Sequence, residues 1–238
     1  PILRAEALEI GHKDKVARAA LASGIFCNLQ RSELVCLLGP NGVGKSTLIR
    51  TLAGIQPALD GQVMLANQSV SKLTPRERAR AISVVLTDPE PAPMMDAFSM
   101  VALGRHPYSG WLGGLSAIDY EKIDWALSMV DASELTARPV AELSDGEQQN
   151  VSIARALAQE APLMLLDEPT AHLDLPRRLK LMALLQRLSH QQNLALLVST
   201  HDLDIALRFA DRLWLLTSDG KLIQGSPESL AINGDLEK

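Results

Sequence analysis

Cysteine is scarce in this chain of 238 residues, which contains only Cys27 and Cys36. Both lie in apolar surroundings, and their spacing is not one that metal ligands use. We therefore expect two buried, reduced thiols in a cytosolic protein, and no metal centre built on cysteine.

The sequence also lacks a long apolar run and an excess of basic charge. Without a run of about 18 apolar residues, the chain is not expected to span a membrane, so any membrane role must come through a partner. Residues 1–9 carry charges within their apolar pattern, which predicts no signal peptide. The net charge of −5 argues against a broad nucleic-acid surface, and we expect no nucleic-acid partner.

What the chain does contain is a large apolar fraction, 47 % against 21 % charged residues, which predicts a globular core. Strands are expected over 2–10, 25–38, 62–65, 82–86, 163–166, 194–199, 212–216 and 221–224. Helices are expected to follow residues 47, 74 and 143, and to cover 96–104, 119–130, 176–190 and 203–209. This alternation predicts an α/β fold with a mainly parallel sheet, beside a small antiparallel sheet near the N-terminus.

The segment 88–158 differs in character from the rest of the chain. It begins with Asp-Pro-Glu-Pro-Ala-Pro, which fits neither a helix interior nor a central strand, and it continues with predicted helices. We expect one domain over 1–238, in which 1–87 and 159–238 form the core with its β subdomain and 88–158 forms an inserted helical subdomain.

A glycine-rich stretch between a predicted strand and a predicted helix is the most informative motif. It comprises Gly39, Pro40, Asn41, Gly42, Val43, Gly44, Lys45, Ser46 and Thr47. Strand, glycine turn and helix form the context of a P-loop, whose amides and helix N-terminus bind phosphate. Lys45 is predicted to reach the terminal phosphates and Ser46 to bind Mg²⁺. A plain glycine turn would not explain the Lys-Ser-Thr that opens the helix.

Two carboxylates, Asp167 and Glu168, follow the apolar strand 163–166. A carboxylate at the end of a parallel strand lies at the crevice where such sheets bind ligands. Alone, the pair is a weak signal, since an acidic turn also fits. With the P-loop in the same chain, Asp167 is predicted to hold Mg²⁺ through water, and Glu168 to orient or deprotonate an attacking water.

The stretch 143–149, Leu-Ser-Asp-Gly-Glu-Gln-Gln, opens another predicted helix. Ser144 and Glu147 fit a capping box, which would make this a well-formed helix start. The same helix N-terminus can bind a phosphate through its amides. The spacing alone leaves both interpretations open.

Together, these motifs resemble the ATP-binding subunit of an ATP-binding-cassette (ABC) transporter, over essentially the whole chain. The matching segments are the P-loop at 39–47, the signature at 143–149 (commonly LSGGQ), the Walker B segment at 163–168, the D-loop at 170–174 and the switch histidine His201.

The resemblance implies Mg²⁺-dependent hydrolysis of ATP by a head-to-tail homodimer that sandwiches two ATP molecules. Each ATP would lie between the P-loop of one copy and the signature of the other. Ser144, Gly146 and Glu147 would then contact the γ-phosphate bound by the opposite copy. His201 would contact the γ-phosphate, and Asp174 would organise the interface between the copies.

Two positions depart from the family pattern. Relatives place an aromatic side chain under adenine where this chain has His12, and an imidazole stacks less extensively than Tyr or Trp. Relatives also carry a Gln that touches Mg²⁺ after the strand 82–86, where this chain has Thr87 followed by Asp88. Either the metal contact is lost, or Thr87 or Asp88 replaces it.

The segments 101–108 and 170–175 resemble those of ATPases that serve bacterial importers of ferric siderophores, haem and cobalamin. The resemblance implies transmembrane permease subunits docked around 87–108, an indirect substrate-binding protein, and a peripheral location on the cytoplasmic face of the inner membrane. It does not identify the substrate, which never touches this subunit.

Two other functions fit parts of the sequence. A soluble ABC ATPase that acts on a non-transport partner would usually carry coiled-coil insertions or tandem cassettes, and this chain has neither. A P-loop kinase of small molecules would need neither the segment 143–149 nor a histidine at a strand end.

Overall fold

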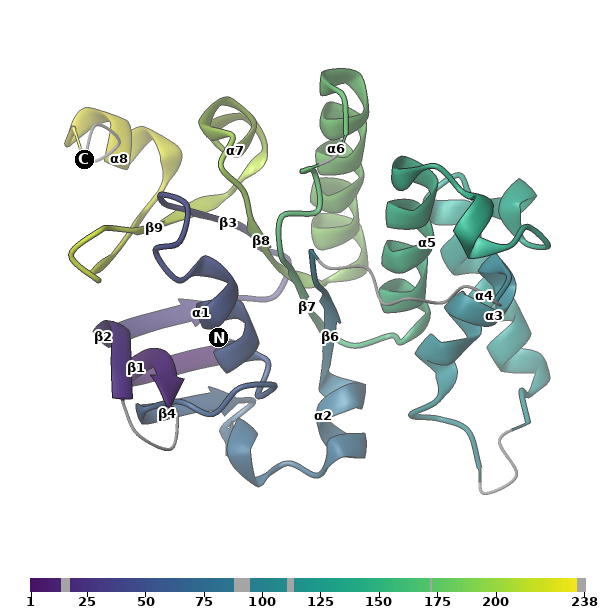
Figure 1. The fold of residues 1–238 in the computed structure, drawn as a ribbon, viewed down its shortest axis with the longest axis horizontal. Coiled ribbons are helices and arrows are strands. Elements are labelled where there is room, and N and C mark those ends of the chain that lie inside the picture. The colour runs from purple at the N-terminus through teal and green to yellow at the C-terminus, as the bar shows by residue number, and fades with distance from the viewer. Residues whose placement is uncertain (14–17, 88–94, 111–113, 172, 235–238) are drawn as a thin grey trace.

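Two β-sheets organise the structure (Figure 1). The computed structural model describes residues 1–13, 18–87, 95–110, 114–171 and 173–234. The larger sheet has six strands in the order β10-β9-β3-β8-β7-β6, and all neighbouring pairs are parallel except β9 and β10. The smaller sheet is antiparallel, in the order β2-β1-β4-β5. The expected α/β class and mainly parallel sheet are thus confirmed.

The strands have the following bounds: β1 Leu3–Lys13, β2 Arg18–Leu29, β3 Leu34–Leu38, β4 Asp60–Leu65, β5 Gln68–Ser69, β6 Ile82–Val85, β7 Leu163–Leu166, β8 Ala195–Ser199, β9 Arg212–Leu216 and β10 Leu222–Gly225. The α-helices are α1 Lys45–Leu52, α2 Pro75–Ala81, α3 Ala97–Ala102, α4 Ala117–Met129, α5 Asp145–Ala158, α6 Leu175–Gln192, α7 Leu203–Phe209 and α8 Pro227–Ile232. Short 3₁₀ turns lie at Val70–Lys72, Leu103–Arg105, Ser133–Leu135 and Val140–Glu142.

Each face of the six-stranded sheet is covered, which explains its continuous apolar strands. Along β3, Val35 and Leu37 face a core shared with α1 and the antiparallel sheet. Leu34, Cys36 and Leu38 face a second core shared with α3 to α7. This alternation follows from the period of two residues in a strand. The two cores hold the strand ends that carry the predicted chemistry.

The helices α3, α4 and α5 lie beside α6, on the side of the sheet away from the antiparallel strands (Figure 1). Among the described residues, no helix is both long and apolar enough to cross a bilayer. Cys27 and Cys36 are buried and free, as expected, and burial raises the pKa of each thiol to about 12.

The single strand expected over 25–38 is wrong, because the chain turns between β2 and β3. Ser32 adopts a left-handed conformation with φ of 55°, and the Gln30 amide donates a hydrogen bond of 2.7 Å to the Glu33 carboxylate. This local polar pairing outweighs the β-propensity of the flanking apolar residues.

The strand expected over 62–65 begins earlier, because Asp60 and Gly61 start β4 at a bulge. Gly61 has φ of +76°, and a Cβ atom there would lie 2.3 Å from the Ala7 carbonyl oxygen. The bulge therefore requires glycine at this position, as glycines inside strands often indicate.

Candidate functional site

The P-loop leaves the end of β3 and leads into α1, as the sequence predicts. Gly39, Gly42 and Gly44 all have positive φ, of 153°, 79° and 113°. At Gly39 the space is also closed, since a Cβ atom would lie 2.4 Å from the Leu216 carbonyl oxygen. Glycine is therefore required here both by conformation and by contact.

Helix α1 is the one α-helix of the described chain that no side chain caps at its N-terminus. The other seven begin at a Ser, Thr or Asp whose side chain accepts a hydrogen bond from a backbone amide of the first turn. In α1 the capping position is Gly44. The first amides of α1 thus remain available to an anion, which the helix dipole also favours.

Lys45 is buried, with 5 % of its surface exposed. Its ammonium donates hydrogen bonds to the carbonyl oxygens of Gly39 at 2.9 Å and Pro40 at 3.2 Å. It also lies 3.6 Å from the Glu168 carboxylate. The loop therefore holds this cation beside the carboxylates at the end of β7.

Ser199, at the end of β8, connects the two carboxylates that follow β7. Its hydroxyl donates a hydrogen bond of 2.7 Å to the Asp167 carboxylate and accepts one of 2.8 Å from the Glu168 amide. Ser199 and Asp167 are both buried. The sequence analysis missed Ser199, and the signal for it was a hydroxyl ending an otherwise apolar strand.

Glu168 has a backbone φ of 46°, in the left-handed region that costs a non-glycine residue about 1–3 kcal/mol. Its carboxylate lies between Lys45 and the imidazole of His201, whose Nδ1 is 3.9 Å away. The His201 side chain is half exposed. Three predicted catalytic residues, from the start of α1 and from the segments after β7 and β8, thus meet at one point.

Thr87 lies beside the same strand end. Its hydroxyl donates a hydrogen bond of 3.0 Å to the Asp167 carbonyl oxygen, and the Asp167 amide donates one to Val85. The Thr87 oxygen keeps a lone pair for a metal ion. The alternative metal ligand, Asp88, lies outside the described residues.

The signature forms the N-terminus of α5. Ser144 accepts a hydrogen bond from the Glu147 amide, and the Glu147 carboxylate accepts one of 2.8 Å from the Ser144 amide, so the predicted capping box is confirmed. Gly146 lies against α6, where a Cβ atom would be 3.0 Å from the Arg177 guanidinium.

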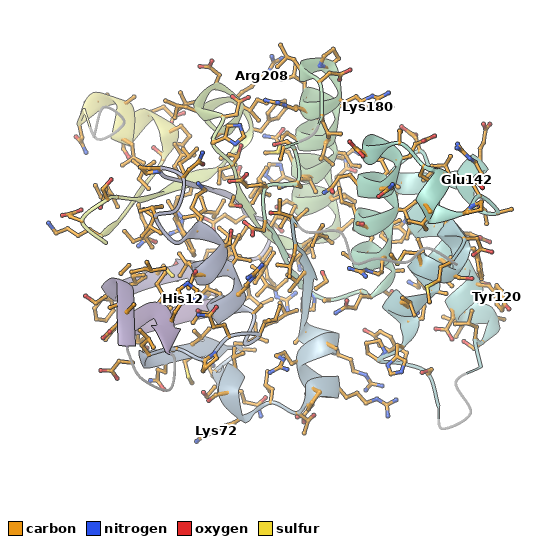
Figure 2. All side chains as sticks on the ribbon, viewed as in Figure 1. His12, Lys72, Tyr120, Glu142, Lys180 and Arg208 are labelled. Carbon is orange, nitrogen blue, oxygen red and sulfur yellow. The ribbon has the colours of Figure 1, made fainter. Side chains whose placement is uncertain are left out.

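The signature and His12 lie on different sides of the molecule. His12 is exposed on β1, and Glu142, next to the signature, lies at the opposite side (Figure 2). No hydrogen bond or ion pair joins the signature to the P-loop within the described chain. The geometry of one copy therefore brings together Lys45, Glu168 and His201 but not the signature.

Asp174, in the D-loop, caps α6 by accepting a hydrogen bond of 3.0 Å from the Arg177 amide. Arg178, which the sequence analysis did not single out, donates a 2.7 Å hydrogen bond to the Leu173 carbonyl and lies 3.5 Å from Asp202. It thus ties the D-loop to the residue after His201. His172 lies outside the described residues.

The oxygen atoms at this site suit Mg²⁺. Asp167 supplies a carboxylate at the strand end and Ser46 a hydroxyl at the start of α1. The described residues hold no cluster of three or more His, Cys, Asp or Glu that would bind a metal without substrate. Mg²⁺ is commonly held by one or two protein oxygens together with substrate phosphates, and this donor set fits that arrangement.

Comparisons with known proteins agree with this geometry. The profile of the family described as ABC transporter matches residues 23–171. An uncharacterized ABC transporter ATP-binding protein of Methanocaldococcus jannaschii, MJ0873, is 38 % identical over 96 % of this chain and 78 % of its own length. The iron(3+)-hydroxamate import ATP-binding protein FhuC of Bacillus subtilis is 34 % identical over 94 % of this chain and 82 % of its own.

Among solved structures, a dimeric post-hydrolysis state of the ATP-binding cassette MJ0796, bound to ADP and Pi, has a similar fold. It is 27 % identical, with a TM-score of 0.83 over 94 % of this chain and 98 % of that chain. The likeness therefore extends over both sheets and the helices beside them.

Proposed function

The chain belongs to the ABC transporter family as an ATP-binding subunit and hydrolyses ATP, and on this premise we propose that it drives a membrane importer. Two copies would sandwich two ATP molecules head to tail and move a pair of permease subunits. The substrate class we propose is ferric siderophore, haem or cobalamin. The hydroxamate importer subunit from Bacillus subtilis supports the siderophore member of this group.

One observation carries the proposal. Lys45 and His201 lie 3.6 and 3.9 Å from the Glu168 carboxylate, beside the uncapped N-terminus of α1. Such a site offers a phosphate cradle, a cation and a base together. Phosphoryl transfer needs little else than positioning and charge stabilisation.

In the proposed reaction, a water molecule attacks the γ-phosphate of ATP in line with the leaving oxygen. The Glu168 carboxylate orients this water and accepts its proton, while Lys45 and the α1 amides stabilise charge on the phosphates. His201 donates a hydrogen bond to the γ-phosphate. Mg²⁺, held by Ser46 and Asp167 with a further oxygen from Thr87, would neutralise charge between the β- and γ-phosphates.

The signature would complete the site from the second copy. Ser144, Gly146 and Glu147 form a helix N-terminus, which attracts the γ-phosphate of the opposite ATP. Hydrolysis and release of phosphate would remove this contact and open the dimer. The D-loop Asp174 would lie at the interface between copies, and His12 would lie against adenine.

We further propose that 88–158 acts as the signature subdomain, against a core formed by 1–87 and 159–238, and carries the permease docking face. Large apolar side chains are exposed there: Met95, Leu103, Ile118 and Tyr120. Phe98 stacks on Tyr120 with 5.6 Å between ring centroids. Exposed apolar patches of this kind mark interaction sites. Docking would place the chain on the cytoplasmic face of the membrane.

The Glu168→Gln variant tests the catalytic assignment. It should bind ATP about as well as the parent chain but hydrolyse it at least 100-fold more slowly, because the amide cannot accept the proton. Glu228→Gln, an exposed glutamate on α8, is the matched control and should keep the parental rate. Steady-state phosphate release measures both. Near-parental turnover in Glu168→Gln would refute the base assignment.

A further inference from the structure

A cavity of about 540 Å³ lies at the edge of the sheet opposite the ATP site. The P-loop, Asp167 and His201 follow the carboxyl ends of β3, β7 and β8. Arg31, Pro162 and Leu194, which line the cavity, precede the same three strands. Because these strands are parallel, the cavity and the ATP site occupy opposite edges.

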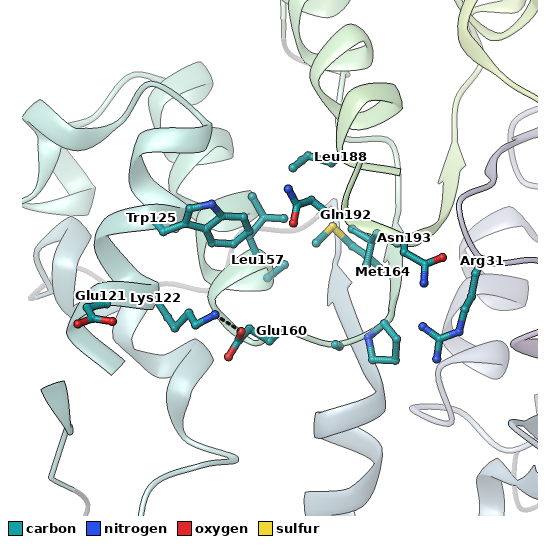
Figure 3. A pocket seen from close by; sticks show the side chains of 14 residues that line it. Arg31, Glu121, Lys122, Trp125, Leu157, Glu160, Met164, Leu188, Gln192 and Asn193 are labelled. Carbon is teal, nitrogen blue, oxygen red and sulfur yellow. Dashed lines mark ion pairs between the residues drawn. The ribbon is translucent and has the colours of Figure 1, made fainter. Parts of the chain in front are cut away.

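The floor of the cavity is apolar and well ordered by packing. Leu157, Met164 and Leu188 line it, and each is at least 96 % buried. The half-buried indole of Trp125, from α4, forms one wall (Figure 3). A flat ring would find an apolar floor and an aromatic face here.

The charged side chains on the cavity rim differ in whether they are paired. Lys122 pairs with Glu160 at 2.5 Å, and Glu160 also pairs with the buried Arg105 at 2.8 Å. Arg31 lies at the end of the cavity away from Trp125 (Figure 3) and makes no ion pair or side-chain hydrogen bond with the described part of the chain. Glu121, the remaining acid, lies at the far end from Arg31 (Figure 3).

Two amide side chains, Asn193 and Gln192, also line the cavity. The Asn193 side-chain oxygen accepts a 2.9 Å hydrogen bond from Ser32, which leaves its NH₂ group to donate elsewhere. Gln192, the last residue of α6, has no side-chain partner in the described chain. The free guanidinium of Arg31 and the Asn193 amide thus lie at one end of the cavity, and the Gln192 amide lies nearer Trp125 (Figure 3).

We propose that this cavity binds a small, flat aromatic anion, with its ring against Trp125 and its carboxylate or sulfonate on Arg31. The volume lies within the range of small-molecule sites, which combine an apolar lining with a few polar groups. An unpaired guanidinium binds two oxygens of one anionic group, such as a carboxylate, through two parallel hydrogen bonds. The positive charge of Arg31 therefore favours an anion, and the indole of Trp125 favours an aromatic ring.

From its position, the cavity would let a bound anion regulate ATP hydrolysis. This regulatory inference rests on the proposed function. Trp125 belongs to α4, among the helices proposed to carry the signature, whereas Leu188 belongs to α6 and Met164 to strand β7 of the sheet. A ligand that touches both sides stabilises one arrangement of the two. Its binding should change the rate of ATP hydrolysis from the side remote from ATP.

The aromatic sulfonate 8-anilinonaphthalene-1-sulfonate is the probe for this site. Its fluorescence should rise on binding to the full chain, and Trp125 emission should fall through energy transfer. Arg31→Gln should weaken binding about tenfold, the loss of one charge-assisted contact. Trp125→Phe should keep most of the binding and lose the Trp125 share of the energy transfer, while Trp111 and Trp214 supply the rest.

Arg187→Gln is the matched control, since Arg187 lies on α6 but lines a different groove, together with Gly146 and Leu173. It should bind the probe as the parent chain does. Equal affinity in Arg31→Gln and the parent would overturn the proposal, and so would selective loss of binding in Arg187→Gln. Circular dichroism confirms that each variant is folded.

A second measurement separates this site from the proposed function. Saturating probe should change the ATP hydrolysis rate of the parent by at least twofold and leave that of Arg31→Gln unchanged at the same concentration. An equal rate change in both chains would overturn regulation through this cavity. The fluorescence assay needs neither ATP nor a permease, so the binding result stands even if the transport proposal fails.

Discussion

At the scale of single residues, Ser199 determines where the two carboxylates of the site point. Its hydroxyl joins the Asp167 side chain and the Glu168 amide, at 2.7 and 2.8 Å, and it is fully buried. The left-handed backbone of Glu168 is held in place by this bond. Ser199 therefore acts through the carboxylates and is a positioning residue.

Ser199→Ala should lower kcat for ATP hydrolysis about 10- to 100-fold, as loss of an outer partner of a metal-binding carboxylate does. Because the change affects Asp167 orientation, the Mg²⁺ concentration for half-maximal rate should rise. Ser189→Ala is the control, since Ser189 is equally buried and donates a 3.0 Å hydrogen bond to Leu194, far from the site. Both variants should lose about 1–3 kcal/mol of stability. An unchanged Mg²⁺ dependence in Ser199→Ala would contradict the positioning role.

The candidate catalytic residues could be predicted from the sequence, but the residues that position them could not. Lys45 and Glu168 lie in motifs whose local context predicts their role, and the role of His201 was predicted from the family resemblance. Ser199 and Arg178 act through contacts between segments far apart in the chain; Glu168 and Ser199, for example, are 31 positions apart. A local pattern contains no such contact, so these two emerged only from the fold.

At the scale of elements, capping divides the helices into two kinds. In helix α1 no side chain caps the first backbone amides. In helix α5 the Ser144 side chain accepts a hydrogen bond from one first-turn amide, that of Glu147. The capping box does not exclude phosphate binding at α5, since it uses only the Glu147 and Ser144 amides. It therefore stabilises the helix start that the proposed γ-phosphate contact needs.

Ser144→Ala separates the two functions of this cap. It should cost about 1 kcal/mol of stability, as loss of an N-cap does, and should also lower the ATP hydrolysis rate, because the signature contact is lost. Ser226→Ala removes the cap of α8 and should leave hydrolysis unchanged. Thermal unfolding and phosphate release measure the two effects. Parental hydrolysis in Ser144→Ala would show that the cap is structural only.

Element type was predictable from periodicity and cap residues, but element boundaries depended on polar contacts. The turn between β2 and β3 depends on the Gln30–Glu33 hydrogen bond, and the start of β4 depends on a bulge against Ala7. Helix α8 was not predicted, although Ser226 and Pro227 supply a cap and a favoured first residue.

At the scale of the whole molecule, the exposed apolar side chains of the α3–α4 region should determine coupling to a permease. Tyr120→Glu should keep the basal ATP hydrolysis rate but lose most of the change in rate that a cognate permease in lipid produces, since a charge on an apolar docking face is unfavourable. Phe26→Glu, at an exposed aromatic on β2, is the control. Equal coupling in both variants would place the docking face elsewhere.

The central claim is that ATP joins two copies, because one copy supplies Lys45 and Glu168 while the other supplies Ser144. The most direct test is the mass in solution of the Glu168→Gln chain, measured by light scattering with and without MgATP. We predict a shift from one copy to two on adding MgATP, which Ser144→Arg in the same background abolishes. A chain that binds MgATP stoichiometrically yet stays a single copy at high protein concentration would contradict the account.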